Sequence, residues 1–524
     1  MTDPASLGQI LGQLFVLLLQ FFFVEFHVNN LARLSIGRYI YRPMSYTPYF
    51  REWRRRLGPM GKKAVKQLRG NTLQELDERL VALVPADTFN PEKSNDHSRS
   101  RIFTFRLTLE CFLWQLLNPG TACREVVRRV QSERRLKYQP VPDEGTSAYI
   151  QSRLKLKEER LEAIMRLTGE ALEKRAPKPT ALQGRRIKVV DGSTTQLPDT
   201  AENQKSYPQP SGQKKGCGFP LIKFLVQFSL QTGAILRVVM HNIHAHDLRL
   251  FRSLWDEFQP GDISLGDRAF GDYLSLAMLP LRGVDVVTRL HQSRKPDQRK
   301  GLALGFHDHL HIFTRGKAPS KHLPLCEWLQ VPEQITVRII KFTIIEKGFR
   351  SEHIVLVTTL LDPVLYPVEE LKAVYLRRWK IELCLRDLKT TLGMEALRCK
   401  SPSMARKELR TYLIAHNLMR SIMLHAALRH DTRIERLSFK GALDSFRQYA
   451  IAFSRSQSLK MHDQLWSDLL INIAADKLPL RPGRREPRAI KNRHRTYALL
   501  NKPRHLFVDI PHRNNYRQKH DSLN

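Results

Sequence analysis

Apolar and polar positions divide the chain into a central region of strands and helices with helical flanks. Between residues 185 and 290, short β-branched runs bounded by turn residues alternate with helix-length segments. Such runs predict strands, and apolar residues recurring every three to four positions predict helices. The predicted strands are 186–190, 223–230, 235–240, 262–265 and 284–288, with helices at 248–258 and 273–281. The order β-β-β-α-β-α-β predicts an α/β fold, a mixed central sheet flanked by helices.

Residues 291–363 interrupt this region with a different composition and hydrophobic pattern. The segment is first rich in His, Lys, Arg and Pro and then contains two β-branched runs, at 334–346 and 352–360. We interpret it as a mostly β insertion. A long helix is predicted from Pro367 to about residue 392, and the apolar periodicity of residues 404–475 predicts further helices.

A helix-turn-helix pattern precedes the α/β region. A predicted helix at 106–117 is stopped by Asn-Pro-Gly, after which Thr121 is predicted to cap a second helix that ends near residue 135. At 100° per residue, Arg124 and Arg128 share one face of that helix, opposite a face of valines. This face could lie on DNA. A solvated basic face on a bundle helix fits the same spacing.

The charge of the chain points to a polyanionic partner. Its 524 residues contain 86 Lys and Arg against 51 Asp and Glu, a formal net charge of +35. Hydrophobic residues make up 42%, enough to exclude a wholly disordered basic protein. An enzyme acting on neutral small molecules does not need this charge, whereas a protein that neutralises phosphates does. Nucleic acid is therefore the expected partner.

The terminal segments and the cysteines limit the cellular compartment and the kinds of site that are expected. The apolar stretch at residues 10–26 is shorter than the roughly 20 residues needed to cross a membrane and lacks a basic region before it, so neither a membrane span nor a secretory signal is expected. From residue 481 to 504, nine Lys or Arg stand against one acid, which predicts a basic tail. The six cysteines contain no C-x-x-C pair, which argues against disulfides and structural zinc and favours a reducing cytoplasm.

Two acidic residues follow predicted strands in the α/β region. Asp191 comes directly after the strand that ends at residue 190, and Asp267 follows the strand 262–265. In open α/β sheets, ligands bind at the carboxyl ends of strands. With a third acid from a later helix, these carboxylates could hold two Mg²⁺ ions for phosphoryl transfer. Each aspartate taken alone is as well explained as a turn residue or a helix cap.

That third acid stands on the predicted helix after residue 367. Tyr375, Arg378, Glu382 and Lys389 fall within a stripe of about 60° on an α-helix. A carboxylate that lies beside two cations and a phenol could bind a metal ion. The neighbouring cations and phenol could donate hydrogen bonds to a phosphate. An exposed helix stabilised by i,i+4 charge pairs has the same pattern.

The spacing Tyr-x2-Arg-x3-Glu-x6-Lys at residues 375–389 resembles the signature of the insertion-sequence-four (IS-4) family of DDE transposases. The resemblance extends over roughly residues 95–505. It includes the segments 103–130, 191–193, 207–220, 266–268, 437–441 and 481–483.

The resemblance implies an RNase H-like fold and a cut-and-paste DNA transposase. It implies that Asp191, Asp267 and Glu382 bind two catalytic Mg²⁺ ions, with Mn²⁺ able to substitute. Tyr375 and the two cations of the signature, Arg378 and Lys389, would contact transposon-end DNA. The expected partners are double-stranded DNA, as terminal inverted repeats and target, and a second copy of the chain in a synaptic homodimer in the bacterial cytoplasm, associated with the nucleoid.

Further residues are candidates for DNA contact. They are Arg268, beside the second acid, Lys214 and Lys215 in a basic glycine loop, and Arg124 and Arg128. No G-x4-G-K-[ST] motif is present, so no nucleotide cofactor is expected. Trp328 could stack on a displaced base or lie in a core. The His-rich loop 241–246 is interpreted as a polar loop.

These features predict seven segments. They are an apolar extension (1–45), a helical DNA-binding region (46–180), the first part of the core (181–290), the β insertion (291–363), the core helix with the third acid (364–400), a helical region (401–480) and a basic tail (481–524). Two alternatives to an active transposase remain: a catalytically inactive DNA-binding relative, and an RNase H-like nuclease without strand transfer.

Overall fold

A computed structural model of the protein describes residues 79–90, 102–214, 216–294, 296, 301–316, 325–344, 352–454, 458–479 and 506. These residues belong to one compact unit of the chain, which begins at Lys66. The predicted extension 1–45, the predicted tail 481–524 except residue 506, and Lys215 lie outside the described residues. Among the residues described, no helix has the length and apolar character that a membrane crossing requires.

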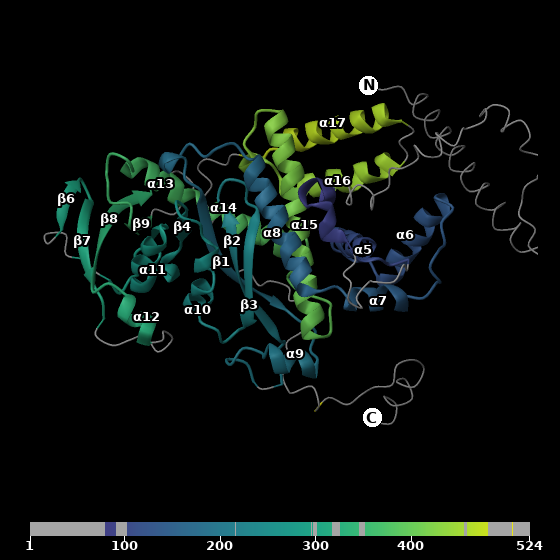
Figure 1. Cartoon of the computed structure of the whole chain (residues 1–524), viewed down its shortest axis with the longest axis horizontal. Coiled ribbons are helices and arrows are strands. Elements are labelled where there is room, and N and C mark those ends of the chain that lie inside the picture. The colour runs from purple at the N-terminus through teal and green to yellow at the C-terminus, as the bar shows by residue number, and fades with distance from the viewer. Residues whose placement is uncertain are drawn as a thin grey trace, which may run out of the picture. The chain divides into compact units, whose positions relative to one another are not determined.

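A mixed sheet organises the described part of the chain (Figure 1). Its strands are β1 (Ile187–Gln196), β2 (Leu221–Ser229), β3 (Ile235–Asn242), β4 (Ile263–Gly266), β5 (Asp285–Arg289), β6 (Leu302–Gly305), β7 (Asp308–Thr314), β8 (Gln334–Ile344) and β9 (Glu352–Thr358). Their order in the sheet is β3-β2-β1-β4-β5-β9-β8-β7-β6. The first three strands pair antiparallel, and β4 and β5 run parallel to β1. This is the predicted RNase H-like arrangement, and the α/β fold class is confirmed.

The β-rich insertion continues the same sheet. Strand β9 pairs antiparallel with β5, and β8, β7 and β6 follow outward. A buried ion pair ties this part to the chain that leads into the next helix. Arg338, fully buried on β8, donates to both carboxylate oxygens of Asp308 and to the carbonyl oxygens of Asp362 and Tyr366. The insertion therefore extends the sheet that carries the acids.

Helices cover both faces of the sheet. They are α5 (Phe105–Leu117), α6 (Cys123–Leu136), α7 (Ser147–Leu154), α8 (Glu158–Arg175), α9 (Ala201–Ser206), α10 (Asp247–Arg252), α11 (Tyr273–Met278), α12 (Leu325–Gln330), α13 (Val368–Arg377), α14 (Trp379–Arg386), α15 (Pro402–Arg429), α16 (Phe439–Ser454) and α17 (Leu459–Ala475). Val189 of β1 packs into a core with α8, α13, α14 and α15, and its neighbour Val190 packs into a second core with α10 and α11. Alternate residues of β1 therefore face different helical layers.

Two predicted boundaries were wrong, at the end of the first strand and at the start of α6. The first strand does not end before Asp191 but runs on to Gln196, because β2 pairs with it along its whole length. The bounds of the helix predicted from Pro367 to about residue 392 are confirmed, but its hydrogen-bond pattern changes at Arg378, which keeps helical backbone dihedrals, and its last turn, Asp387–Thr391, is π-helical. The N-cap of α6 is Ala122 in place of Thr121, and its backbone N–H donates to the side chain of Glu125.

Candidate active site

The register between β1 and β4 brings two aspartates together. Val189 pairs with Leu265 in the parallel ladder. Asp191 lies two residues further along β1, and Asp267 lies two residues after Leu265, directly past the end of β4. They therefore stand at the same level on neighbouring strands and point to the same face of the sheet. Val189 and Leu265 both pack into the core that includes α13 and α14, so this is the face that those helices cover.

Local hydrogen bonds hold both aspartates. The backbone N–H of Gly192 donates to Oδ1 of Asp191 at 2.8 Å. Oδ1 of Asp267 accepts from the backbone N–H of Ala269 at 2.8 Å and so caps the short 3₁₀ turn Arg268–Phe270. The hydroxyl of Thr288 on β5 donates to the backbone carbonyl of Asp267. Asp191 therefore lies within strand β1, whereas Asp267 lies in the turn that directly follows β4.

Glu382 comes to this edge from α14, which packs against β1. Its Oε1 atom accepts a hydrogen bond from Nη2 of Arg378 at 2.9 Å, one helical turn earlier. The Arg378 side chain is 9% exposed, whereas that of Glu382 is 54% exposed. The carboxylate is therefore accessible from solvent while its arginine partner is held inside the fold.

The three acids share one electrostatic neighbourhood. Burial raises the pKa of Asp191 to about 6, and the charges of Asp267 and Glu382 add to this rise. The Gly192 N–H and the Arg378 charge oppose it. The charges of the other two acids therefore reach the carboxyl group of Asp191.

Tyr375 and Arg378 adjoin the acids. Tyr375 is 3% exposed, and burial raises its pKa, while the charges of Arg378 and Arg289 act in the opposite direction. The guanidinium carbon of Arg378 lies 5.8 Å from the centre of the Tyr375 ring. Within the described part of the chain, the buried Nε of Arg378 has no hydrogen-bond partner. A buried guanidinium with spare donor capacity is suited to an anionic ligand.

The other candidate residues are distributed around the fold. Lys389 is half-buried on the π-helical turn, and Arg268, next to Asp267, donates to Gln292 at 3.0 Å. Lys214 is exposed in a loop before β2 that the side chain of Gln209 fastens through several backbone hydrogen bonds.

The amphipathic character predicted for the second N-terminal helix is confirmed in α6. Arg124 and Arg128 are exposed, while Val126, Val127 and Val130 are buried in a small core with α5 and α7. Arg128 contacts Gln131 and Glu144. The structure gives no contact between these arginines and the three acids.

Two other features that the sequence singled out have structural roles. Trp328 is 9% exposed, packs into the second core and lies 4.9 Å below the guanidinium of Arg315. In the His-rich loop, His246 caps α10 by accepting from the backbone N–H of Leu248, and His241 accepts from the N–H of Asn242.

The oxygen atoms of Asp191, Asp267 and Glu382 are the candidate ligands of a divalent metal. In the described ranges, no group of three or more His, Cys, Asp and Glu side chains is arranged to hold a metal ion. Glu382 is turned to Arg378, and each aspartate oxygen named above accepts from a backbone N–H. The chemistry of the set nevertheless fits, because three carboxylates offer the oxygen ligands that Mg²⁺ prefers, and burial raises the pKa of one of them, Asp191.

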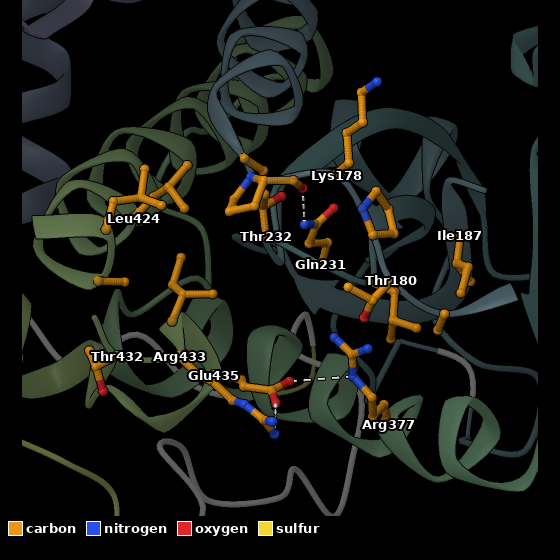
Figure 2. Close-up of a pocket in the computed structure, with 18 of the residues that line it drawn as sticks. Lys178, Thr180, Ile187, Gln231, Thr232, Arg377, Leu424, Thr432, Arg433 and Glu435 are labelled. Carbon is orange, nitrogen blue, oxygen red and sulfur yellow. Dashed lines mark hydrogen bonds and ion pairs between the residues drawn. The ribbon is translucent and has the colours of Figure 1, made fainter. Parts of the chain in front are cut away.

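A separate cavity of about 350 Å³ lies at the other end of β1, where Ile187 forms part of its wall (Figure 2). Burial opposes ionisation of Glu435 there, but Lys380 and Arg377 hold the pKa of this carboxyl below its usual value. Ion pairs at 2.7 Å to Lys380 and 3.5 Å to Arg377 account for this. None of the three acids lines this cavity.

One residue of the site was missed by the sequence reasoning. Arg289, the last residue of β5, influences the pKa of Tyr375 together with Asp267 and Arg378. The signal was present, because the predicted strand 284–288 ends just before it, as the strand before Asp267 does. It was overlooked because only acids were sought at strand ends.

Comparisons with known proteins find transposases among the proteins similar to this chain. Residues 182–418 match the family described as "Transposase DDE domain". The chain is 25% identical over 406 residues to the transposase InsG for insertion sequence element IS4 of Escherichia coli (strain K12), which covers 76% of this chain and 88% of that protein. A solved structure of a piggyBac transposase synaptic complex with hairpin DNA aligns with a TM-score of 0.37 and 10% identity, covering 79% of this chain and 85% of that one.

Proposed function

Because this chain belongs to the DDE transposases of the insertion-sequence-four type, we propose that it moves an insertion sequence by a cut-and-paste reaction. In this reaction the protein binds the terminal inverted repeats, cleaves DNA at each end, and joins the freed 3′-hydroxyl to target DNA. The observation that carries the proposal is the shared level of Asp191 and Asp267 on β1 and β4, with Glu382 close enough to perturb the first.

Asp191, Asp267 and Glu382 are the proposed metal ligands. A DDE domain implies the use of divalent metal ions, and we propose two Mg²⁺ ions. When bound, such ions activate the attacking oxygen and stabilise the leaving oxygen of an in-line phosphoryl displacement. The aspartates are held by strand and turn geometry, whereas Glu382 must turn from Arg378 or share its second oxygen. The raised pKa of Asp191 reflects a site that is stabilised by added positive charge.

Tyr375, Arg378 and Lys389 are proposed to hold the DNA end against these acids. Arg378 is suited to this role because its buried guanidinium already contacts one acid and retains a donor for a phosphate oxygen. Tyr375 supports the guanidinium from below and offers a hydroxyl donor. Lys389 follows on the π-helical turn, a conformation that is frequent at functional sites.

The remaining basic residues are proposed to bind the flanking duplex. Arg124 and Arg128 lie on the exposed face of α6, while Arg268 and Lys214 are exposed in loops that follow β4 and precede β2. Lys215 is proposed to act with Lys214. Since each end must be cut and both joined to one target, we further propose that two copies of the chain act together.

Cleavage of a labelled terminal inverted repeat in the presence of Mg²⁺ tests this function. Glu382→Gln should bind the end with unchanged affinity and lose cleavage by at least about 1000-fold, as expected for loss of a metal ligand. Glu369→Gln is the matched control, because Glu369 lies on the preceding helix, is 83% exposed and pairs with Lys372. Normal cleavage by Glu382→Gln would refute the site.

A second candidate is a DNA-binding relative that has lost catalysis. It is favoured by the absence, among the residues described, of a preformed three-acid metal group. Specific binding of the inverted repeat by the wild-type chain without any cleavage in Mg²⁺ or Mn²⁺ would support it. Nicking without recovery of joined product from a target plasmid would point instead to a nuclease without strand transfer.

A further inference from the structure

Two cavities adjoin near the start of β1. The first is the cavity of about 350 Å³ shown in Figure 2, and the second, of about 280 Å³, is lined by α14 and the π-helical turn that follows it. Leu230, Gln231 and Glu435 belong to the walls of both. The two cavities therefore form one hollow that extends from Ile187 along α14.

The walls of this hollow carry an excess of positive charge. Four Lys or Arg side chains line the first cavity and four others line the second, against two acids, Glu435 and Asp387. Figure 2 shows Arg377 and Arg433 on either side of Glu435, with Lys178 on the opposite side of the cavity in this view. We call the two cavities together the basic groove.

Half of these cations have structural partners. Arg377 and Lys380 pair with Glu435, at 3.5 and 2.7 Å. Arg420 donates to a backbone carbonyl in the turn between β2 and β3 at 2.7 Å, and Arg185 pairs with an aspartate of β5 at 2.7 Å. These four side chains therefore hold the walls of the groove together.

The other four cations are exposed at the rim of the groove. The side chains of Arg433 and Arg386 are 84% and 60% exposed, and they lie 4.0 and 3.9 Å from an acid of the wall. Lys178 and Lys440 are exposed as well, and neither forms an ion pair with a residue that the structure describes. Because exposed ion pairs at the distance limit contribute little, these four charges are available to an external anion.

Exposed cations on a basic protein can simply be solvated. These four, however, come from separate segments and surround one hollow: the loop before β1, α14, the 3₁₀ turn before α16, and α16 itself. A row of cations along a hollow suits a chain of regularly spaced anions, such as a nucleic-acid backbone. The row also approaches the acids, because Arg386 follows Glu382 by one helical turn.

The surfaces proposed above for the terminal repeat lie toward the other end of β1. Lys214 precedes β2, whose first residue pairs with Gln196, the last residue of β1. Gln196 also bridges to the segment before α15, from which Arg398 donates to the carbonyl oxygen of Thr121, just before α6. A strand of ten residues spans about 30 Å. The two basic surfaces therefore lie toward opposite ends of β1, with Asp191 between them.

We propose that the basic groove binds the sugar-phosphate backbone of the target DNA. The proposal rests on the function proposed above, since strand transfer requires both a freed end and a target at one set of acids. Two basic surfaces at opposite ends of β1 allow each DNA segment to reach the acids from its own side. Lysine and arginine contacts to phosphates do not depend on base sequence, which suits a duplex that lacks the terminal repeat.

Binding of a second duplex to the end-loaded protein tests this assignment. The full chain is loaded with terminal repeats that already carry a free 3′-hydroxyl, and its affinity for a labelled duplex of unrelated sequence is measured in Ca²⁺, so that binding is observed without joining. Lys178→Ala with Lys440→Ala removes one exposed charge from each cavity, and Lys178→Glu with Lys440→Glu reverses both. Arg249→Ala with Arg282→Ala is the matched control, because both side chains are exposed and lie beside α10 and α11 on the other face of the sheet.

Lys178→Ala with Lys440→Ala should weaken binding of the unrelated duplex about 10-fold, and the slope of log affinity against log salt should become shallower by about 2. Charge reversal should weaken binding further. Affinity for the terminal repeat and its cleavage should stay within about twofold of wild type, as should every value for the control pair. In Mg²⁺, joining to a target plasmid should fall at low target concentration and recover at high concentration.

Four outcomes would overturn the proposal. Wild-type affinity for the unrelated duplex in Lys178→Ala with Lys440→Ala would refute the groove, and so would failure of the end-loaded wild type to bind a second duplex. An equal loss in the control pair would assign the effect to net charge alone. An equal loss of affinity for the terminal repeat would mean that the groove does not distinguish the target.

Failure of the groove and failure of the proposed function are distinguishable. Cleavage of the terminal repeat by wild type, with Glu382→Gln inactive, leaves the proposed function intact whichever result the groove variants give. Normal cleavage by Glu382→Gln would reject the proposed function itself.

Discussion

Asp191 and Asp267 stand at one level on neighbouring parallel strands, and burial together with the charges of Asp267 and Glu382 raises the pKa of Asp191 to about 6. Two carboxylates brought together in this way destabilise each other when both are ionised. Added positive charge beside Asp191, such as the metal ions proposed above would bring, would relieve this repulsion. Glu382, paired with Arg378 at 2.9 Å, is the acid whose existing partner must be displaced or shared.

Asp191→Asn should stabilise the protein in the absence of divalent metal. The pKa of Asp191 is about 6 in the folded state, above its ordinary value of 3.8. The stability that the protonated Asp191 carboxyl gives the folded state is therefore fully present below about pH 4 and is lost as the pH rises through 6. At pH 7.5 we expect the variant to gain about 1–3 kcal/mol in free energy of unfolding. Mg²⁺ should raise the melting temperature of wild type only. A variant that is less stable than wild type in EDTA would contradict this.

Asp387→Asn should stabilise the protein by the same mechanism, away from the proposed ligands. Burial raises the pKa of Asp387 to about 6, and Arg386 and Arg420 offset this only in part. The stability difference between variant and wild type should be near zero at pH 4, should grow as the pH rises through 6, and should then level off at about 1–3 kcal/mol. Melting curves from pH 4 to 8 measure it, with the exposed Asp463→Asn as control. A difference that does not change with pH would exclude this cause.

Arg338→Met should strongly destabilise the insertion. The change leaves the Asp308 carboxylate, 3% exposed, without the two hydrogen bonds of 2.7 and 2.8 Å that it now accepts. Removing one partner of a buried ion pair costs about 3–5 kcal/mol, whereas replacing both partners with apolar residues is often close to neutral. Urea unfolding should therefore show a large loss for Arg338→Met and a substantial recovery for Arg338→Met with Asp308→Leu. Equal losses in both variants would rule out the unpaired charge as the cause.

Arg124→Ala with Arg128→Ala should weaken binding to the inverted repeat while leaving cleavage of saturated complexes unchanged. Both side chains are exposed on α6, and no contact with the acids is seen for them. If each contacts a phosphate, the slope of log affinity against log salt should become shallower by about 2. Arg429→Ala with Arg433→Ala, on another exposed surface, is the control. An equal change in slope for the control pair would mean that α6 is not a specific DNA-binding surface.

Local patterns predicted much of the fold because the relevant forces act over a few residues. The hairpin of β2 and β3 was evident from its β-branched runs and the Gln-Thr-Gly turn, and the structure confirms it. The basic and valine faces of α6 were predicted from helical periodicity, since burial of the valines and solvation of the arginines require no knowledge of distant residues.

Element ends were predicted less well because they depend on partners elsewhere in the chain. Strand β1 runs past Asp191 since β2 satisfies its backbone groups as far as Gln196. The π-helical turn at Asp387–Thr391 changes the angular position of Lys389 from that of an ideal α-helix. The strands of the insertion were predicted, but their continuation of the core sheet depends on the pairing of β9 with β5.

The sequence by itself determined which side chains are available, namely two aspartates after β-branched runs, a glutamate in a signature of fixed helical spacing, and an excess of positive charge. Only the tertiary structure decided that Asp191, Asp267 and Arg289 follow at one level on neighbouring strands and that α14, which carries Glu382, packs against β1. The reason is that register between strands and packing of a helix on a sheet are long-range contacts, which no local spacing encodes.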